Sequence, residues 1–294
     1  MILLRSTSIT SLALLLALAN PAPSSTRTPQ VLLAEAEQGN AEAQFRLARA
    51  HLKGEGVPKN PTKAYLWMKK SADQGYPDAI GGMGYFYSAG VEVEKDDAEA
   101  VRRFRQGVEK GSVRALLNLG LVTANGRGLP QDHAEGLRMI DDAAAKSLPE
   151  ALNAQAETYF YGQFGRSQDY GKARESYRRA AEAGILGAQN ILGVIYRDGL
   201  GVSRDEETAI HWFRQAAEQG DAKGQSNLGH LLGVVSEDLT RRVEALKWVT
   251  LAADQNEVTA VKTLEEMPTL MGEYVAAGRA AADLFRKKSE EAAP

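Results

Sequence analysis

The sequence predicts an all-α protein: a right-handed α-α superhelical solenoid of about six two-helix repeats, closed by a C-terminal capping helix. Three observations support this prediction. Small residues recur with a period of 36 residues, apolar residues within each period have helical spacing, and glycines mark the turn inside each repeat and the end of each repeat. The 294 residues contain no cysteine, so we expect packing alone to stabilise the fold.

The period can be read from three sets of aligned positions. The first set holds small residues at Ala43, Ala79, Ala115, Ala151, Ala188, Gly224 and Ala260, spaced by 36 or 37 residues. The second set holds glycines at Gly54, Gly90, Gly126, Gly162, Gly199 and Gly233. The third holds small residues at Ala64, Ala100, Gly136, Ala173, Ala209 and Ala245. Three registers that share one period indicate tandem repeats.

The first helix of each repeat contains a recurrent glycine. Residues 188–196 place small, Leu, Gly and Tyr residues at i, i+4, i+5 and i+8, which is one helical stripe. A glycine inside a helix costs about 1 kcal/mol relative to alanine. Glycine nevertheless recurs at Gly84, Gly120, Gly193 and Gly229. We expect a neighbouring helix to approach closely at these positions.

The second helix of each repeat carries a bulky residue one turn after its small marker, at Met68, Phe104, Ile140, Tyr177, Phe213 and Val249. Gly75, Gly111, Gly184 and Gly220 suit left-handed C-caps, and Ser147 and Asn256 take their place in two repeats. Beyond the repeats, the capping helix is predicted over residues 270–288 from the spacing of Leu270, Tyr274, Ala277, Ala281 and Leu284, with a loose tail after it.

This pattern resembles the Sel1-like repeat, a relative of the tetratricopeptide repeat. The resemblance is carried by small-x-small-x-x-x-Leu-Gly-x-x-Tyr, then Gly-x-Gly-Val-Pro, then Ala-x-x-Trp-Phe-x-x-Ala-Ala-x-x-Gly. Residues 41–75 and 187–220 match it closely, and the whole match covers residues 40–260. The fourth repeat departs from it at Gln155 and in its Gln163-Phe164 loop, and the loop of the sixth repeat is shorter.

The chain divides into a signal peptide (1–19), a linker (20–30), the repeat array (31–260), and a capping helix with its tail (261–294). The first segment combines a basic start at Arg5, an apolar run from Leu12 to Leu18, and a small-x-small site that ends at Ala19. These features are typical of a cleaved signal peptide. We therefore expect export to the periplasm or the exterior of a bacterium, with no membrane span in the mature chain.

The sequence offers no catalytic set, metal site or cofactor site. None of the four histidines pairs at the spacing of a helical zinc site. His51 stands where other repeats have Tyr and is expected in the core, whereas His211 is expected on a solvated face. A formal net charge of −3 with scattered basic residues argues against nucleic acid as a partner.

We expect a protein or peptide partner on the inner face of the solenoid, which the first helices line. If tetratricopeptide geometry applies, that face includes Arg49, Tyr85, Leu121, Asn153, Glu157, Asn190, Val194, Arg197 and His230. Asn118 and Asn227 lie one position off that register and are added as neighbours. Side-chain amides on this face can bond a peptide backbone. The structural alternative is that Asn118 and Asn227 brace the next helix, and the loops or the outer face remain rival surfaces.

The leading functional hypothesis is a non-catalytic adaptor or scaffold in the bacterial cell envelope. It depends on the array, the signal peptide and the missing catalytic set. The alternative is a secreted virulence or host-interaction factor built on the same array. A third alternative, a cell-wall or β-lactam hydrolase, lacks a nucleophile, a base or a metal in a suitable constellation.

Overall fold

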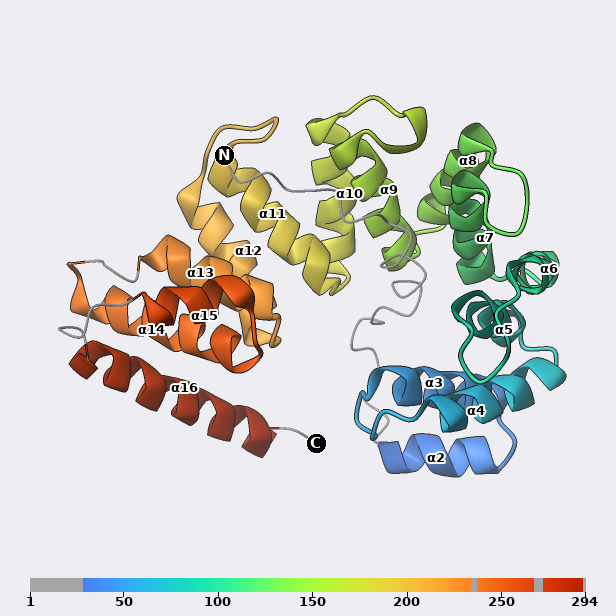
Figure 1. Ribbon diagram of the computed structural model, residues 1–294, viewed down its shortest axis with the longest axis horizontal. Helices are drawn as coiled ribbons and strands as arrows, with labels where there is room; N and C mark the ends of the chain where they lie inside the picture. The colour runs from blue at the N-terminus through green and yellow to red at the C-terminus, as the bar shows by residue number, and fades with distance from the viewer. Residues whose placement is uncertain (1–28, 234–236, 267–271, 293–294) are drawn as a thin grey trace. The chain divides into compact units, whose positions relative to one another are not determined.

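The computed structural model describes residues 29–233, 237–266 and 272–292, and its regular structure there is entirely helical (Figure 1). The predicted signal peptide and most of the predicted linker lie outside these residues. A lone helix, α2 (Pro29–Glu37), comes first. Gly39, just after it, lies 36 residues before Gly75, so α2 occupies the place of a second helix before the first pair.

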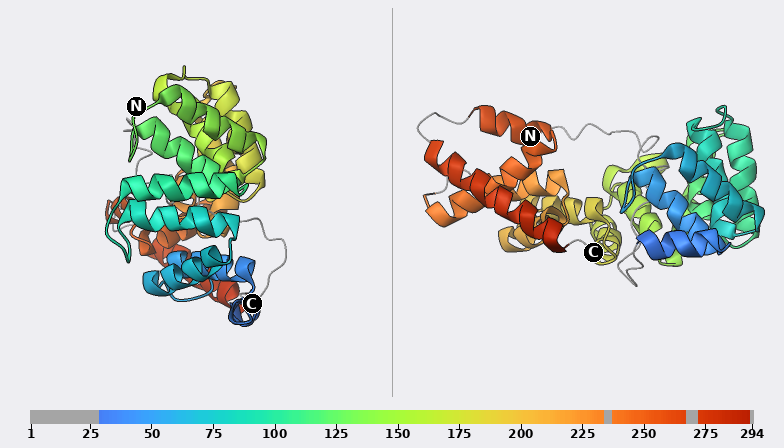
Figure 2. Two further views of the ribbon diagram at one scale, coloured as in Figure 1. Left: turned by 90° about the vertical axis from the view of Figure 1, so that its right-hand side faces the viewer. Right: turned by 90° about the horizontal axis from the view of Figure 1, so that it is seen from below.

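Six helix pairs follow, and each pair is one repeat. The pairs are α3 (Ala41–Lys53) with α4 (Pro61–Asp73), α5 (Pro77–Ala89) with α6 (Asp97–Glu109), α7 (Val113–Asn125) with α8 (His133–Ala145), α9 (Pro149–Tyr161) with α10 (Tyr170–Glu182), α11 (Leu186–Asp198) with α12 (Glu206–Glu218), and α13 (Ala222–Leu232) with α14 (Leu239–Asp254). The left view of Figure 2 shows α5 and α6 side by side. Each second helix also contacts the next first helix in pairs such as α4 with α5 and α12 with α13.

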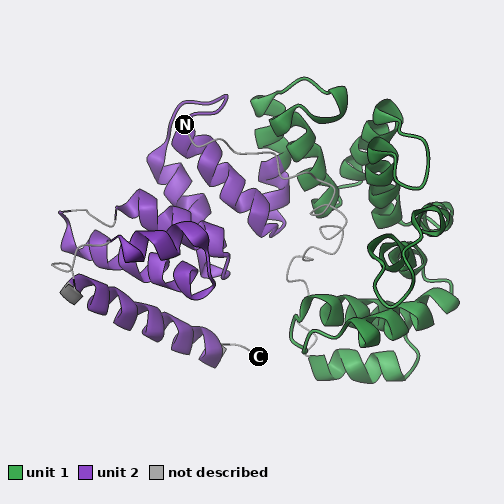
Figure 3. Cartoon of the chain, in the orientation of Figure 1, with its two compact units in different colours: residues 1–176 green, residues 177–294 purple. Residues whose placement is uncertain are grey.

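Two compact units divide the chain, Met1–Ser176 and Tyr177–Pro294, and their boundary falls within α10 (Figure 3). In each unit, neighbouring first helices contact one another, as α5 does with α7 and α11 with α13. These contacts place first helices of neighbouring repeats side by side, and we call the face that they form in each unit its inner face.

Polar side chains cap the N-termini of most helices, and residues in the left-handed backbone conformation follow the last helix of each repeat. Asn40 Oδ1 accepts from the Ala43 amide at 2.9 Å, and Asp96 Oδ1 accepts from the Glu99 amide at 2.8 Å. Such N-caps satisfy amides that have no partner within the helix. Ser147 and Asn256 adopt φ of 59° and 60°, the left-handed conformation that glycine adopts at the equivalent positions. The predicted C-caps are thus confirmed even where glycine is replaced.

The recurrent helical glycines lie where a partner helix touches the backbone. A Cβ on Gly193 would lie 2.4 Å from Phe213, and one on Gly229 would lie 2.5 Å from the Val249 side chain. Side chains essentially never approach this closely, so only glycine permits this packing. The expectation of close helix approach is confirmed.

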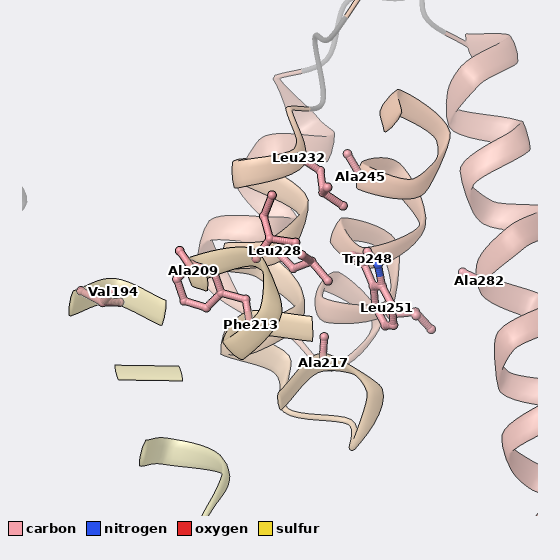
Figure 4. Close-up of a cluster of buried hydrophobic side chains, with 11 residues drawn as sticks. Val194, Ala209, Phe213, Ala217, Leu228, Leu232, Ala245, Trp248, Leu251 and Ala282 are labelled. Atoms are coloured by element: carbon pink, nitrogen blue, oxygen red, sulfur yellow. The ribbon is translucent and has the colours of Figure 1, made fainter. Parts of the chain in front are cut away.

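Each compact unit has its own hydrophobic core between its helix layers. In the second unit, Phe213, Leu228 and Trp248 are almost completely buried and pack with Leu232 and Leu251 (Figure 4). Phe86 and Met68 have the same role in the first unit. Of these residues, Met68 and Phe213 come from the second-helix positions that the helical spacing predicted.

Glutamines join three successive elements at three of the repeats. Gln44 Nε2 donates to the Ala36 carbonyl at 3.0 Å, and Gln74 Nε2 donates to Gln44 Oε1 at 2.7 Å. Two further repeats share this pattern. In one, Gln189 donates to the Ala181 carbonyl and Gln219 donates to Gln189. In the other, Gln225 donates to the Ala217 carbonyl and Gln255 donates to Gln225. We call each set a glutamine brace. Each brace binds a first helix both to the preceding repeat and to the second helix of its own repeat.

The fourth repeat compensates for its departures with a polar network. Gln155, which replaces the expected Leu, donates to Asp141 at 2.8 Å and accepts from Ser176 at 2.8 Å. Its loop forms the short 3-10 helix η1 (Gln163–Gly165), in which Phe164 has φ 55° and packs on His133. The departure of this loop from the repeat pattern thus appears as an irregular backbone, and α10 follows it as in the other repeats.

The last helices form a cap whose buried face differs from the predicted one. Helix α15 (Val258–Glu265) is the final first-type helix, and α16 (Gly272–Ala292) packs along α14. Gly278, Ala282 and Phe285 face α14, whereas Leu284 is 55% exposed. The prediction that the stripe with Leu284 is the buried face of the capping helix is thus wrong. The small residues Gly278 and Ala282 let the backbones of α16 and α14 approach each other, so their face is buried instead. The predicted loose tail is also wrong as far as residue 292, where α16 ends.

Candidate partner-binding surface

The inner face of the first compact unit is largely closed by its own side chains. Of the six residues predicted there, Arg49, Asn118, Leu121 and Asn153 are buried, and Tyr85 and Glu157 are partly accessible. Buried side chains cannot contact a partner in this conformation. The prediction of an open inner face therefore applies to only part of this unit.

A cluster of charged residues brings first helices from four repeats together. Arg49 Nη2 of α3 lies 3.8 Å from Glu150 Oε1 of α9, and Arg114 of α7 also pairs with Glu150. Arg114 Nε lies 3.6 Å from Asp78 Oδ2 of α5, and Asp78 accepts from Ser112 Oγ at 2.6 Å. We call this set the inner ion cluster. It links α3, α5, α7 and α9, and its charged side chains are at most 26% exposed.

Burial shapes the electrostatics of this cluster. Desolvation lowers the pKa of Arg49 to about 10, and the nearby charge of Arg114 adds to the effect, whereas Glu150 opposes it. Arg49 remains charged at neutral pH. The side chain of Glu150 is completely buried, so its two arginine partners provide the compensation that a buried charge needs.

Sequence reasoning missed three members of the cluster, although a signal was present. Asp78, Arg114 and Glu150 are spaced by 36 residues and therefore occupy one repeat position in three successive repeats. Their charges alternate in sign along that position. Because neighbouring repeats bring equivalent positions together, such alternation predicts ion pairs across repeats.

A second polar group lies on α9. Asn153 Nδ2 donates to Glu157 Oε1 at 2.9 Å. Desolvation raises the pKa of Glu157 to about 7, although the Asn153 hydrogen bond opposes the shift. Burial, together with the nearby Glu157, raises the pKa of Tyr161. The Glu157 carboxylate can therefore change its protonation state near neutral pH.

The second compact unit presents an accessible row of polar side chains. Asn227 Nδ2 of α13 donates to Asn190 Oδ1 of α11 at 2.8 Å, and Arg197 Nη1 lies 3.5 Å from Asn227 Oδ1. On α13, His230 is exposed and lies 3.2 Å from Thr263 Oγ1 of α15. We call Asn190, Arg197, Asn227, His230 and Thr263 the polar row.

The polar row agrees with both roles predicted for its asparagines, contact with a partner and bracing of a neighbouring helix. Asn190 is buried and Asn227 bonds it, so Asn227 does brace a neighbouring helix. The Arg197 side chain keeps 36% of its surface exposed while it pairs with Asp198. Val194 is buried beneath the row as part of the core. Arg197, Asn227 and His230 are therefore the predicted residues of this unit that a partner can reach.

Enzymatic features are not evident in the part of the chain that the structure describes. No three His, Asp or Glu residues there are grouped so as to hold a metal ion. His51 is buried and its Nδ1 lies 3.1 Å from the Pro58 carbonyl oxygen, and His211 is exposed on α12. Both therefore lie where the sequence predicted. Within the same residues, no helix combines the length and apolar character that a membrane crossing requires.

Pairs of 13-residue helices in the first five repeats and a sixth pair of 11 and 16 residues, repeated every 36 or 37 residues, define a tandem-repeat solenoid. The Sel1 repeat family matches residues 41–76, 77–112, 113–147, 149–185, 187–221 and 222–257. The chain belongs to this family. Proteins built from these repeats are generally scaffolds for protein interactions and are typically non-catalytic.

A solved structure and two curated relatives resemble the chain. A Sel1 repeat protein from Oxalobacter formigenes is 30% identical with a TM-score of 0.59, over 74% of this chain and 89% of that one. An F-box protein of Arabidopsis thaliana is 33% identical over 40% of this chain and 32% of its own length. The chitin synthase regulator SKT5 of Malassezia restricta is 32% identical over 34% of this chain and 7% of its own length. The chain thus spans a third or less of these two curated relatives.

Proposed function

We propose that this protein is an exported, non-catalytic scaffold that binds a protein partner along the polar row of its second compact unit. The observation that carries the proposal is the contrast between the two inner faces. In the first, four of the six predicted residues are buried and the inner ion cluster links the helices, whereas the second presents Arg197, Asn227 and His230 at its surface. Amide, guanidinium and imidazole groups in a row can bond the backbone of an extended peptide.

The charge state of the polar row fits a segment without net charge. Desolvation lowers the pKa of His230, an effect that Glu257 opposes and Arg197 reinforces, so the imidazole is neutral at pH 7. The neutral ring can donate or accept a hydrogen bond. Arg197 pairs with Asp198, which lies at the solvated edge. The row therefore selects by hydrogen-bond geometry more than by net charge.

Crosslinking in cells tests this proposal directly. The chain would carry a C-terminal tag, and the captured proteins would be identified by mass spectrometry. We expect one defined protein to be captured by the native chain and lost from an Asn227→Ala, His230→Ala variant. His211→Ala provides the control, since His211 is exposed on a second helix. Capture that survives in the double variant, or no specific capture at all, would contradict the proposal.

The proposal of export depends on the apolar run from Leu12 to Leu18 and the small residues up to Ala19. Cell fractionation with N-terminal sequencing tests it. We expect a mature chain that begins at Asn20 in the periplasm of the source bacterium. The same chain in the culture medium alone would favour the secreted, host-interacting alternative. A chain retained in the cytoplasm with Met1 in place would contradict export.

A further inference from the structure

A groove runs between α2 and α4 at the N-terminal part of the first compact unit. It encloses a volume of about 580 Å³, within the roughly 300–1,000 Å³ of typical ligand sites. Its floor and walls are formed mainly by apolar side chains, namely Leu33, Leu47, Val57, Pro58, Leu66 and Trp67. We call it the first groove.

Two of these side chains are unusually open to solvent. Leu66 is 52% exposed and Leu33 is 40% exposed, and they belong to the two helices that flank the groove. Val31, also on α2, is 46% exposed. Contiguous exposed apolar side chains around a concave site are typical of protein-interaction surfaces.

The rim of the first groove carries a positive charge that the structure leaves unneutralised. Lys63 and Lys70 line it, and neither forms an ion pair with any described residue. The Lys70 ammonium lies 4.4 Å from the centre of the Trp67 ring. Glu37 is the one acidic side chain among the described residues that line the groove. The rim is therefore complementary to an anionic group beside an apolar one.

The next repeat provides an internal comparison. A groove at the equivalent place, 36 residues later, lies between α4 and α6 and is lined by Lys69 and Arg103, where the first groove has Leu33 and Trp67. In this second groove, Lys69 pairs with Asp73 at 2.6 Å, and Arg103 pairs with Glu99 at 2.7 Å. One backbone arrangement thus carries a polar, internally neutralised surface in one repeat and an apolar surface with two unpaired lysines in the other.

We infer that the first groove docks an amphipathic helix of a partner protein that presents aliphatic or aromatic side chains flanked by Asp or Glu. The apolar side chains would cover Leu33, Leu66 and Trp67, and the carboxylates would approach Lys63 and Lys70. A groove between two helices suits this mode of recognition, in which an amphipathic helix lays its apolar face into the groove. These residues are distinct from the polar row, so the two proposals succeed or fail separately.

Sequence composition argues against occupation by the chain's own preceding segment. Residues 1–28 contain no Asp or Glu, and therefore lack the carboxylates that complement the lysine rim. A second copy of the protein is the remaining competitor for the groove, and sedimentation of the native chain and of the groove variants distinguishes it from a partner helix.

Peptide selection tests the inference. The purified exported chain would be used to select binders from a phage library of random 16-residue peptides, and enriched peptides would be assayed by fluorescence anisotropy. We expect a shared pattern of apolar residues at helical spacing with adjacent Asp or Glu. Leu33→Lys with Leu66→Arg installs the residues that stand 36 positions later, Lys69 and Arg102, and Lys63→Glu with Lys70→Glu reverses the rim charge. Each double variant should weaken binding by at least about tenfold.

The matched control is Lys69→Glu with Arg103→Glu, which makes the same charge change in the second groove and should leave binding unchanged. All four altered positions of the first groove are exposed, so the variants should keep the native circular dichroism and melting temperature. Enriched peptides that bind the groove variants equally well, or the absence of enrichment, would overturn the inference. A native dimer in sedimentation that becomes monomeric in Leu33→Lys, Leu66→Arg would overturn it in favour of a second copy.

Discussion

Arg49 and Glu150 lie 101 positions apart in the sequence, yet their side chains approach to 3.8 Å. The contact joins α3 of the first repeat to α9 of the fourth. In a simple solenoid each repeat touches only its neighbours. Here a single buried carboxylate connects repeats that are not adjacent, so the first compact unit has an internal closure that the repeat pattern alone does not require.

Removal of this carboxylate should destabilise the protein strongly. In Glu150→Gln, Arg49 and Arg114 keep their charges but lose their shared partner. Breaking a buried ion pair from one side typically costs about 3–5 kcal/mol, and we expect a loss of that order in urea unfolding followed by circular dichroism. Glu135→Gln breaks an exposed pair with Arg138 and should leave the unfolding midpoint nearly unchanged. Equal midpoints for the two variants would contradict a stabilising role for the inner ion cluster.

Glu157 should make stability depend on pH. Its pKa in the folded protein is about 7, above the value of about 4.3 for an exposed glutamate. Between these two values the folded state binds more protons than the unfolded state, so stability falls as the pH rises through this range. Below about pH 4.3 Glu157 is protonated in both the folded and the unfolded state, so the stability that it contributes is fully present. This contribution is lost completely once the pH exceeds the folded-state pKa.

The variant Glu157→Gln should remove this dependence and still accept the Asn153 hydrogen bond. At pH 8 we expect it to be more stable than the native chain by about 1–3 kcal/mol. The difference should shrink toward zero at pH 4, as measured by urea unfolding at a series of pH values. Glu291→Gln, at an exposed position near the end of α16, provides the control. A constant difference at all pH values would show that Glu157 does not titrate in this range.

Two helical glycines should respond oppositely to alanine. A Cβ on Gly120 would lie 2.9 Å from the Gly136 carbonyl oxygen and from Met139, whereas a Cβ on Gly187 meets nothing within 4 Å. We expect Gly120→Ala to cost about 1–3 kcal/mol through overpacking. Gly187→Ala should stabilise by about 0.5–1 kcal/mol through higher helix propensity. Thermal unfolding would measure both, and a stabilised Gly120→Ala would contradict close packing of α7 on α8.

The contact between α16 and α14 should depend on the small residue at position 278. A Cβ on Gly278 would lie 2.5 Å from the Leu246 side chain, so Gly278→Leu should displace the cap and uncover part of the Trp248 cluster. We expect a lower melting temperature and increased binding of a hydrophobic dye. Ala280→Leu adds the same bulk on the exposed side of α16. Dye binding by both variants alike would contradict the assigned face.

The repeat period allowed most of the fold to be predicted from the sequence. Helix order, the reason for Gly193 and Gly229, and the left-handed caps at Ser147 and Asn256 all follow from local propensity and spacing. The face of α16 was predicted wrongly because apolar periodicity favoured Leu284, whereas close backbone approach depends on the small residues Gly278 and Ala282.

The candidate site was harder to predict because burial depends on contacts between repeats. Arg49 and Asn153 occupy inner-face positions by register, yet ion pairs and neighbouring helices cover them. The alternating charges at Asp78, Arg114 and Glu150 carried this information, but only when the repeats are compared position by position. Accessibility within a repeat array is therefore a property of successive repeats together.

The glutamine braces have a consequence for how such a gene can change in length. Gln189 and Gln225 each reach a carbonyl eight residues earlier, at Ala181 and Ala217. Excision of residues 187–222 would place Gln225 eight positions after Ala181 and restore the same hydrogen bond in the shortened chain. Excision of this one period therefore keeps a glutamine brace between the two repeats that become neighbours. A repeat can thus be removed at this place without any compensating change in the glutamines that join the repeats.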